Sequence, residues 1–249
     1  MTIVTRSRLL LDPGSQDVEV VERKGLGHPD SICDALSEEV SRTLCRDYLE
    51  RSGRILHHNV DKVLLVGGSS APRFGGGEII QPVEVFLAGR ATAEWNRSAI
   101  PVDDLTRDAC VSWIQSHLRA DVLRHMRITP LVRPGSTDLR ALFARGPQSL
   151  LANDTSCGAG FAPLSTLERL VLQVENTLND AVIKTRYPAI GEDIKVMAVR
   201  HVHRVTMTIA CAMVDRFIHD ATDYADHKLG VQRIARDLAR STGSFDVTV

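Results

Sequence analysis

The sequence predicts an α+β fold with antiparallel or mixed sheets, on three observations. Some segments repeat apolar residues at helical spacing and others alternate apolar with polar residues, so helices and strands are both expected. Strands follow one another at hairpin-like distances and helices interrupt them irregularly, unlike the regular alternation of a doubly wound sheet. The glycine-rich segment 25–30 lacks the G-x-G-x-x-G of a dinucleotide-binding fold, and the chain contains no Walker loop.

The clearest element is a helix that begins after His28. Pro29 stands at the first helical position and Asp30 adds an acidic residue to the first turn, which is typical of a helix start. Gly53 is a normal stop signal. Between these ends, one apolar face repeats at i+4 and consists of Ile32, Leu36, Val40 and Leu44.

The middle of the chain predicts strands, loops and a second helix. An extended stretch at 54–66 is followed by a glycine loop at 74–77 and by a strand around 83–87 with alternating apolar residues. The second helix begins after Pro101. The segment 127–148 is rich in Pro, Gly and Arg, and we interpret it as strand and loop.

A second strong helix start lies at Ser165. Glu168 follows it at the spacing of a capping box, in which each side chain satisfies a backbone donor of the other residue. The remaining elements are two strands joined by a tight turn at 203–204, a last helix and a final strand, at 195–202, 205–214, 222–240 and 245–249. We divide the chain into a first α+β unit at 1–125 and a second at 126–249, with an approximate boundary across which the units can interleave.

Composition excludes several classes of function. The 30 Lys and Arg nearly cancel the 31 Asp and Glu, and this balance argues against a nucleic-acid partner. The five cysteines are scattered without a C-x-x-C, which argues against a disulfide framework or a zinc cassette. No signal peptide or apolar run of membrane-spanning length is present, so the sequence predicts a soluble, cytoplasmic protein with no membrane partner.

The segment 21–30 carries the richest chemistry. Glu22, two basic residues, His28 and Asp30 lie on a glycine-hinged loop that ends at a helix N-terminus, where exposed N–H groups favour anions. A histidine donates to phosphate oxygens and a carboxylate holds Mg²⁺ that bridges phosphates, so the pattern suits polyphosphate chemistry. The alternative is an ordinary helix start beside a solvated charged loop.

Two further polar segments are candidates for binding. Asp193 and Lys195 are spaced i and i+2 on a strand and so share one face; the alternative there is a surface ion pair. The loop 151–160 precedes the capped helix and offers groups for sugar hydroxyls, or merely for its own backbone. Its polar residues are Asn153, Asp154, Thr155 and Ser156.

Taken together, eight blocks between residues 18 and 217 resemble the archaeal-type S-adenosylmethionine synthetases (methionine adenosyltransferases) in the family's order. They read VERKGLGHPDSICD, ILHHNVDKV, LVGG, FGGG, LAGRAT, LANDTSCGAGFAPLSTLERLVL, GEDIKVM and TIACAMVDR. The resemblance implies related α+β units around a pseudo-threefold axis, and active sites between two subunits of a dimer. It also implies an ATP-binding transferase of one-carbon metabolism that joins ATP to methionine with Mg²⁺ and K⁺, then hydrolyses the released triphosphate.

The resemblance also implies roles for single residues. His28 steadies the triphosphate, Asp30 binds Mg²⁺ and Glu22 lies in the metal shell. Lys195 contacts a phosphate and Asp193 the nucleoside. The loop residues line the adenosine or methionine pocket: Asn153, Asp154, Thr155 and Ser156. No acid–base pair is needed, because a thioether nucleophile has no proton to lose and the enzyme must only align it and neutralise the leaving group.

The family's glycine-rich loop is changed in this chain. Where the family has Gly-x-Gly-Ser, the segment 131–136 reads LVRPGS, so Arg133 and Pro134 replace the first glycine and its neighbour. The remaining members of the loop, also expected to bind substrate, are Gly135, Ser136 and Asp138. Arg133 is a candidate for a new phosphate contact.

The chain also resembles a family member without its C-terminal third. Three readings stay open: a truncated enzyme or one part of a split enzyme, working as a homodimer or with a complementary subunit; a non-catalytic nucleotide-binding or regulatory partner subunit; and an enzyme that uses another nucleophile.

Overall fold

The structure is a computed structural model that describes residues 13–119, 121–136 and 160–249. Two units form: one takes in 13–25 and 160–249, the other 26–119 and 121–136. We call them the split unit and the continuous unit. The boundary that the sequence suggested, at residue 125, falls inside the continuous unit, because the strand that follows it pairs with an earlier strand of that unit. The units interleave along the chain, and the α+β class is confirmed. None of the described helices is long and apolar enough to cross a membrane.

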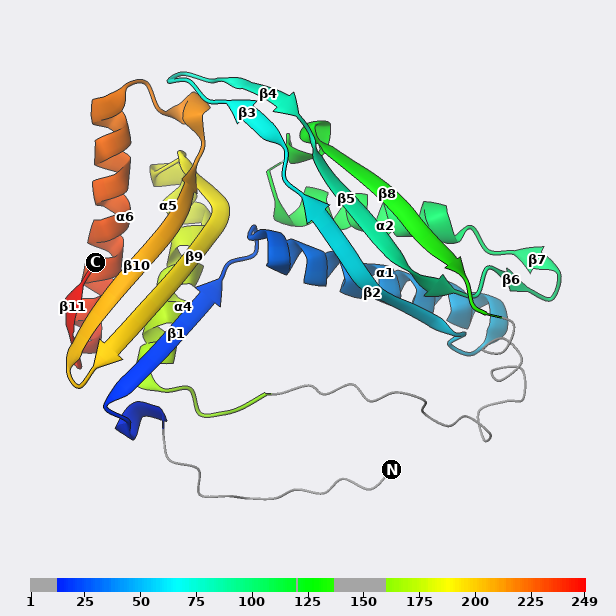
Figure 1. The fold of residues 1–249 in the computed structure, drawn as a ribbon, viewed down its shortest axis with the longest axis horizontal. Helices are drawn as coiled ribbons and strands as arrows, with labels where there is room; N and C mark the ends of the chain where they lie inside the picture. The colour runs from blue at the N-terminus through cyan, green and yellow to red at the C-terminus, as the bar shows by residue number, and fades with distance from the viewer. Residues whose placement is uncertain (1–12, 120, 137–159) are drawn as a thin grey trace. The chain divides into compact units, whose positions relative to one another are not determined.

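The continuous unit is a three-stranded sheet with two helices on one face (Figure 1). The strand order is β2-β5-β8, with β2 antiparallel and β8 parallel to the central β5. Two short hairpins, β3–β4 and β6–β7, and a 3₁₀ turn, η2, complete it. The elements are α1 (Pro29–Ser52), β2 (His58–Val66), β3 (Ser69–Ala71), β4 (Glu78–Gln81), β5 (Val83–Ala91), β6 (Glu94–Trp95), β7 (Ser98–Ala99), α2 (Val102–His117), η2 (Val122–His125) and β8 (Met126–Pro134).

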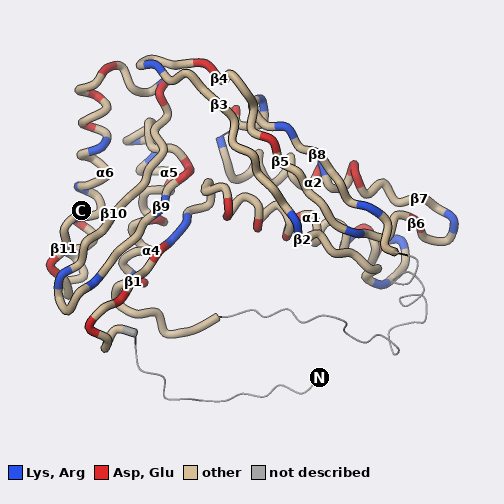
Figure 2. The backbone as a smooth tube through the Cα atoms, viewed as in Figure 1, with Lys and Arg blue, Asp and Glu red and all other residues tan. Residues whose placement is uncertain are grey.

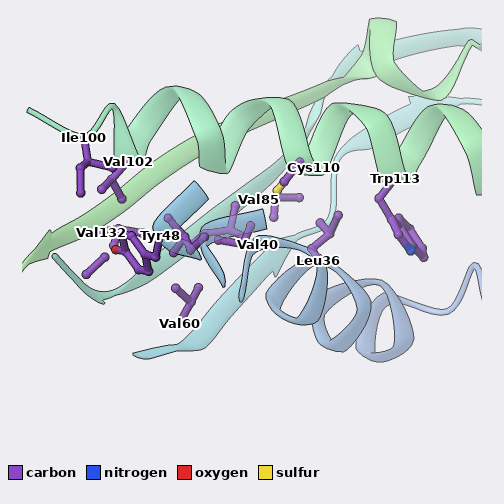
Figure 3. Close-up of a cluster of buried hydrophobic side chains, with 14 of the residues drawn as sticks. Leu36, Val40, Tyr48, Val60, Val85, Ile100, Val102, Cys110, Trp113 and Val132 are labelled. Carbon is purple, nitrogen blue, oxygen red and sulfur yellow. The ribbon is translucent and has the colours of Figure 1, made fainter. Parts of the chain in front are cut away.

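The core of the continuous unit lies between the sheet and its helices (Figure 3). The i+4 stripe predicted for α1 is confirmed, and it extends to Tyr48, whose ring is fully buried. Leu36 meets Val85 from the sheet and Cys110 from α2 in the same cluster. Burial of each such aliphatic side chain stabilises the fold by about 1.5–3 kcal/mol, so this layer holds α1 and α2 against one face of the sheet only.

The split unit repeats this plan with a four-stranded sheet in the order β1-β9-β10-β11. The first three strands are antiparallel, and β11 is parallel to β10. The helices α4 and α6 pack on one face around a second apolar cluster (Figure 1). The elements are η1 (Pro13–Ser15), β1 (Val18–Lys24), α4 (Thr166–Asn179), α5 (Ala181–Arg186), β9 (Ile190–His201), β10 (Arg204–Met213), η4 (Asp215–Phe217), α6 (Ala221–Thr242) and β11 (Asp246–Thr248).

The capping box at the start of α4 is confirmed and has an additional partner. Ser165 Oγ accepts from Glu168 N–H at 3.0 Å, and Glu168 accepts from Ser165 N–H at 2.6 Å. The same hydroxyl donates to the buried carboxylate of Glu19 on β1. Arg200 on β9 binds that carboxylate through Nη2 at 3.1 Å, with side chains only 5% and 7% exposed. This buried network ties β1 to β9 and to the helix that covers them.

Two predicted boundaries were displaced. The strand expected at 54–66 begins only at His58, after an irregular stretch. The turn between β9 and β10 lies at Val202 and His203, one residue before the predicted 203–204. Val202 has φ of 56°, which is costly for a β-branched residue. Its N–H donates to the carbonyl of Asp17 at 2.7 Å, so β1's neighbouring segment helps to hold this conformation.

Candidate functional site

His28 is the N-cap of α1. Its backbone is extended, and its ring Nδ1 accepts the N–H of Asp30 at 3.1 Å, which satisfies one of the donors at the helix start. An Nδ1 that accepts carries no proton, so the neutral ring has its proton on Nε2. The half-buried side chain therefore keeps an N–H donor for an anion at this helix end.

Asp30 lies in the first turn of α1 with an exposed side chain. A carboxylate in this position is favoured by the helix dipole and is the type of oxygen ligand that Mg²⁺ prefers. One turn later, burial raises the pKa of the Cys33 thiol, and the charges of Asp30 and Asp34 raise it further. Cys33 is therefore protonated near neutrality and is a poor nucleophile.

A compensated cluster of charges forms where β1 and β9 pair. Lys24 and Lys195 are directly opposite in the register. Glu22 lies between them: its carboxylate oxygens are 3.9 Å from Lys24 Nζ and 3.3 Å from Lys195 Nζ. The three side chains are more than a third exposed, so a ligand can reach them. An anion that bound Lys195 would compete with Glu22 for the ammonium.

Asp193 and Lys195 share one face of β9, as predicted. Both are half-buried, and the alternating Ile194 and Val196 are fully buried against the helices. Burial raises the pKa of Cys211, on the paired strand β10, to about 11, and the charge of Asp193 contributes to that rise. The thiol next to this strand is therefore neutral at physiological pH.

Glu175 on α4 was missed by the sequence analysis. Its side chain is only 4% exposed and accepts from Arg23 Nε at 3.3 Å and from Asn179 Nδ2 at 2.7 Å. A Cβ on Gly25 would meet the Glu175 and Asn179 side chains at 2.8 Å and the carbonyl of Ile194 at 2.9 Å. The loop that leads to His28 is thus fixed at Gly25. The available signal was an acidic residue inside the apolar stripe of a helix.

Gly135 and Ser136 follow the end of β8 in the continuous unit, with Gly135 buried and Ser136 exposed. This end of the sheet lies by the C-terminal end of α1, because Tyr48 Oη donates to the carbonyl of Thr92, just after β5, at 2.9 Å. His28 stands at the other end of α1. A helix of 24 residues is about 36 Å long. The continuous unit therefore does not bring these loop residues together with His28 and Asp30.

The other predicted residues divide between the two units or lie beyond them. Glu22, Asp193 and Lys195 belong to the split unit, and His28 and Asp30 to the continuous unit. The remaining five lie outside the described residues: Asp138, Asn153, Asp154, Thr155 and Ser156. Across the described ranges, no group of three or more His, Cys, Asp or Glu side chains is arranged to hold a metal ion.

Comparisons with known proteins decide the family. The model of S-adenosylmethionine synthetase (AdoMet synthetase) matches residues 3–249. The chain belongs to this family. The resemblance drawn from the eight sequence blocks is therefore confirmed.

Relatives of this synthetase family align with nearly all of the chain. A probable S-adenosylmethionine synthase of Aquifex aeolicus is 48% identical over 238 residues, which are 94% of this chain and 60% of the relative. The S-adenosylmethionine synthase of Methanothermobacter marburgensis is 48% identical over 86% of this chain and 53% of its own length. That of Hyperthermus butylicus is 45% identical over 99% of this chain and 62% of its own. The chain thus spans a little over half of the length of these relatives.

A search of solved structures also returned a synthetase. It is titled an unusual S-adenosylmethionine synthetase from Campylobacter jejuni, and it superposes with a TM-score of 0.48 at 15% identity. The superposition covers 89% of this chain and 53% of that one.

Proposed function

We propose that this chain takes part in the synthesis of S-adenosylmethionine from ATP and methionine, with release and hydrolysis of the triphosphate. The observation that carries the proposal is the state of His28: its Nδ1 accepts the N–H of Asp30, so its Nε2–H remains as a donor at a helix N-terminus. That arrangement suits a phosphate group. Family membership supports the choice of substrates.

The adenosyl transfer needs no general acid or base. The methionine sulfur attacks C5′ of the ribose with a lone pair, the C5′–O bond breaks, and its electron pair leaves on the triphosphate. We assign to His28 a hydrogen bond to that triphosphate. We assign to Lys195 a charge contact to a phosphate, for which its ammonium leaves the carboxylate of Glu22, now 3.3 Å away. Such preoriented donors stabilise charge that grows in the transition state. Asp193, on the same face of β9, is assigned to the nucleoside.

We propose that Asp30 and Glu22 would hold Mg²⁺, as the family resemblance implies. Both are carboxylates on exposed residues, and carboxylate oxygens are ligands that Mg²⁺ prefers. Mg²⁺ commonly takes one or two carboxylates together with substrate phosphates, and when bound it offsets part of their charge. K⁺ is proposed on the family resemblance alone.

The length of α1 supports a role for a second subunit. Gly135 and Ser136 follow the end of the sheet that lies by the C-terminal end of α1, whereas His28 stands at the other end of this helix of 24 residues, which is about 36 Å long. No small substrate bridges that span. We therefore propose that a homodimer, or a complex with a complementary subunit, supplies the loop residues of one chain to the His28 end of another. The remaining assigned residues complete that pocket: Asp138, Asn153, Asp154, Thr155 and Ser156. We also propose that the protein acts in the cytoplasm on its substrates ATP and methionine.

The test is formation of S-adenosylmethionine by the purified chain from ATP, methionine, Mg²⁺ and K⁺, followed by mass spectrometry. We expect His28→Ala and Lys195→Ala each to lower kcat by about 10²–10³, the usual cost of one transition-state donor. His125→Ala and Lys228→Ala remove exposed side chains of the same types and serve as matched controls. Equal loss in variants and controls would refute the assignment.

Two further outcomes separate the alternatives. Product from a mixture of His28→Ala chains with chains altered at Ser136, neither of which is active alone, would support sites that draw on two subunits. Binding of ATP without any product would instead support a nucleotide-binding partner subunit.

A further inference from the structure

Two arginines lie side by side on the open face of the β2-β5-β8 sheet. Arg90 on β5 and Arg133 on β8 are Cα partners in the parallel register, and both are exposed. Their neighbours Ala91 and Val132 are buried in the core, so alternation turns the arginines to the face opposite α1 and α2. Figure 2 shows basic segments on both strands. Facing like charges on adjacent strands repel, so this placement calls for an anion.

The same two strands carry a matched pair in which the charge is balanced. Six residues earlier on each strand, and hence on the same face, Glu84 is the register partner of Arg127. Glu84 Oε1 lies 3.9 Å from Arg127 Nη1. At one end of these two strands an arginine therefore faces a carboxylate, and at the other end an arginine faces a second arginine.

Among the described residues, no carboxylate pairs with Arg90 or Arg133. Arg90 Nη1 donates to the carbonyl of Pro134 at 3.1 Å, which holds its guanidinium over the end of β8. On the paired strand β2, the only acidic residue is Asp61, and its carboxylate lies 2.8 Å from Lys62. The counter-charge for the two arginines is thus not provided by these strands.

We propose that Arg90 and Arg133 form a binding site for phosphate groups, either those of a nucleoside triphosphate or those of the released triphosphate. One guanidinium satisfies a carboxylate in a bidentate pair, whereas two guanidiniums match the higher charge and several oxygens of a phosphoryl group. Gly135 and Ser136 follow directly, so the loop assigned to substrate adjoins the site. The choice of ligand rests on the proposed function.

The site is distinct from the His28 end of the same chain. Arg90 precedes Thr92 by two residues, and Thr92 accepts from Tyr48 near the C-terminal end of α1. In one chain, the arginine pair and His28 therefore cannot hold the same phosphate. A phosphate bound at Arg90 and Arg133 is therefore either one that also contacts the His28 end of another chain or a second phosphate, separate from the one at His28.

The test is calorimetric titration of the full chain with tripolyphosphate at constant ionic strength, without methionine. We expect Arg90→Gln and Arg133→Gln each to weaken binding roughly tenfold to a hundredfold, because hydrogen bonds to charged groups contribute at that level. Arg133→Lys keeps the charge without the planar fork and is expected to bind with intermediate affinity. Arg127→Gln is the matched control on the same face and is expected to bind as the wild type does.

A second readout reports repulsion without any ligand. In phosphate-free buffer, Arg133→Gln should raise the melting temperature and Arg127→Gln should not. Saturating tripolyphosphate should reverse the order by stabilising the wild type more than the Arg133 variant.

The inference is overturned if tripolyphosphate binds Arg90→Gln, Arg133→Gln and the wild type alike. It is also overturned if the substitutions weaken binding of methionine and leave tripolyphosphate unaffected, because the anion would then be a carboxylate. Parallel titrations with ATP and with tripolyphosphate distinguish the two sources of phosphate. Failure of the proposed synthesis is a separate result, seen as absence of product while tripolyphosphate binding still depends on both arginines.

Discussion

Each unit places two like charges opposite one another on paired strands, and the two pairs are balanced differently. In the split unit, Lys24 and Lys195 are register partners, with the carboxylate of Glu22 between them at 3.9 and 3.3 Å. In the continuous unit, Arg90 and Arg133 are register partners, and no carboxylate of the described residues pairs with them. The lysines have an internal anion that a ligand can replace. The arginines have no such anion among the described residues, and the proposed phosphate ligand would supply it.

The largest expected effect concerns a buried ion pair of the split unit. Glu19 and Arg200 form a pair whose side chains are 7% and 5% exposed. Glu19→Gln leaves the buried guanidinium without its counter-charge, and we expect a loss of about 3 kcal/mol in the free energy of unfolding. Urea-induced unfolding measures this loss. Arg127→Gln breaks an exposed ion pair and should lower the free energy of unfolding by less than about 1 kcal/mol. Equal losses in the two variants would contradict the view that the buried pair contributes more to stability than the exposed one.

A second prediction concerns the two lysines after their internal anion, Glu22, has been removed. Glu22→Gln removes the anion between Lys24 and Lys195, so their ammonium groups become available to phosphate. In an Arg90→Gln, Arg133→Gln background, we expect tripolyphosphate affinity to rise about fivefold, corresponding to roughly 1 kcal/mol for an exposed pair of charges. Calorimetric titration at low and high salt measures the rise, which should shrink as salt screens the charges. Unchanged affinity would mean that Glu22 does not compete with ligands.

A third prediction concerns the opposite change, in which one of the two paired arginines is replaced by a carboxylate. Arg90→Glu would place a carboxylate opposite Arg133, as Glu84 lies opposite Arg127. We expect a gain of about 0.2–1 kcal/mol in the free energy of unfolding, the usual range for facing opposite charges. Tripolyphosphate binding should be lost at the same time. A variant that is more stable and still binds tripolyphosphate would separate the two properties and count against the site.

A last effect appears only at alkaline pH and concerns one buried thiol in each unit. Burial raises the pKa of Cys211 in the split unit to about 11 and that of Cys110 in the continuous unit to about 12, from an ordinary value of 9.0. The folded state thus prefers the neutral thiols. Their contribution to stability is complete below about pH 9 and is lost as the pH rises through the folded values. Cys211→Ala should flatten the fall in melting temperature between about pH 8 and about pH 11, whereas parallel curves would contradict this assignment.

The local elements could be predicted from the sequence because their signals are local. Pro29 at the start of α1, the i+4 stripe that ends before Gly53, and the capping box of Ser165 and Glu168 all appear where expected. The face shared by Asp193 and Lys195 follows from strand alternation alone. Each of these depends on residues within a few positions of one another.

Features that depend on pairing between distant segments could not be predicted. Nothing in the sequence of β1 indicates that it pairs with β9, so the division of the chain at residue 125 was displaced. The role of Glu175 depends on Arg23, from the far end of the chain. The opposition of Arg90 and Arg133 depends on a parallel register that only the assembled sheet defines.

The arrangement of the split unit sets an order for folding during synthesis. The described elements of the continuous unit all lie between residues 29 and 134, so they can pack before the later strands have left the ribosome. β1 precedes the continuous unit in the chain, yet its partner β9 begins only at Ile190. Until then β1 is an unpaired strand, and its Val18 and Val20 stay exposed even after it pairs with β9. Unpaired strands of this kind invite aggregation, so β1 has to wait for its partner while the whole continuous unit is made.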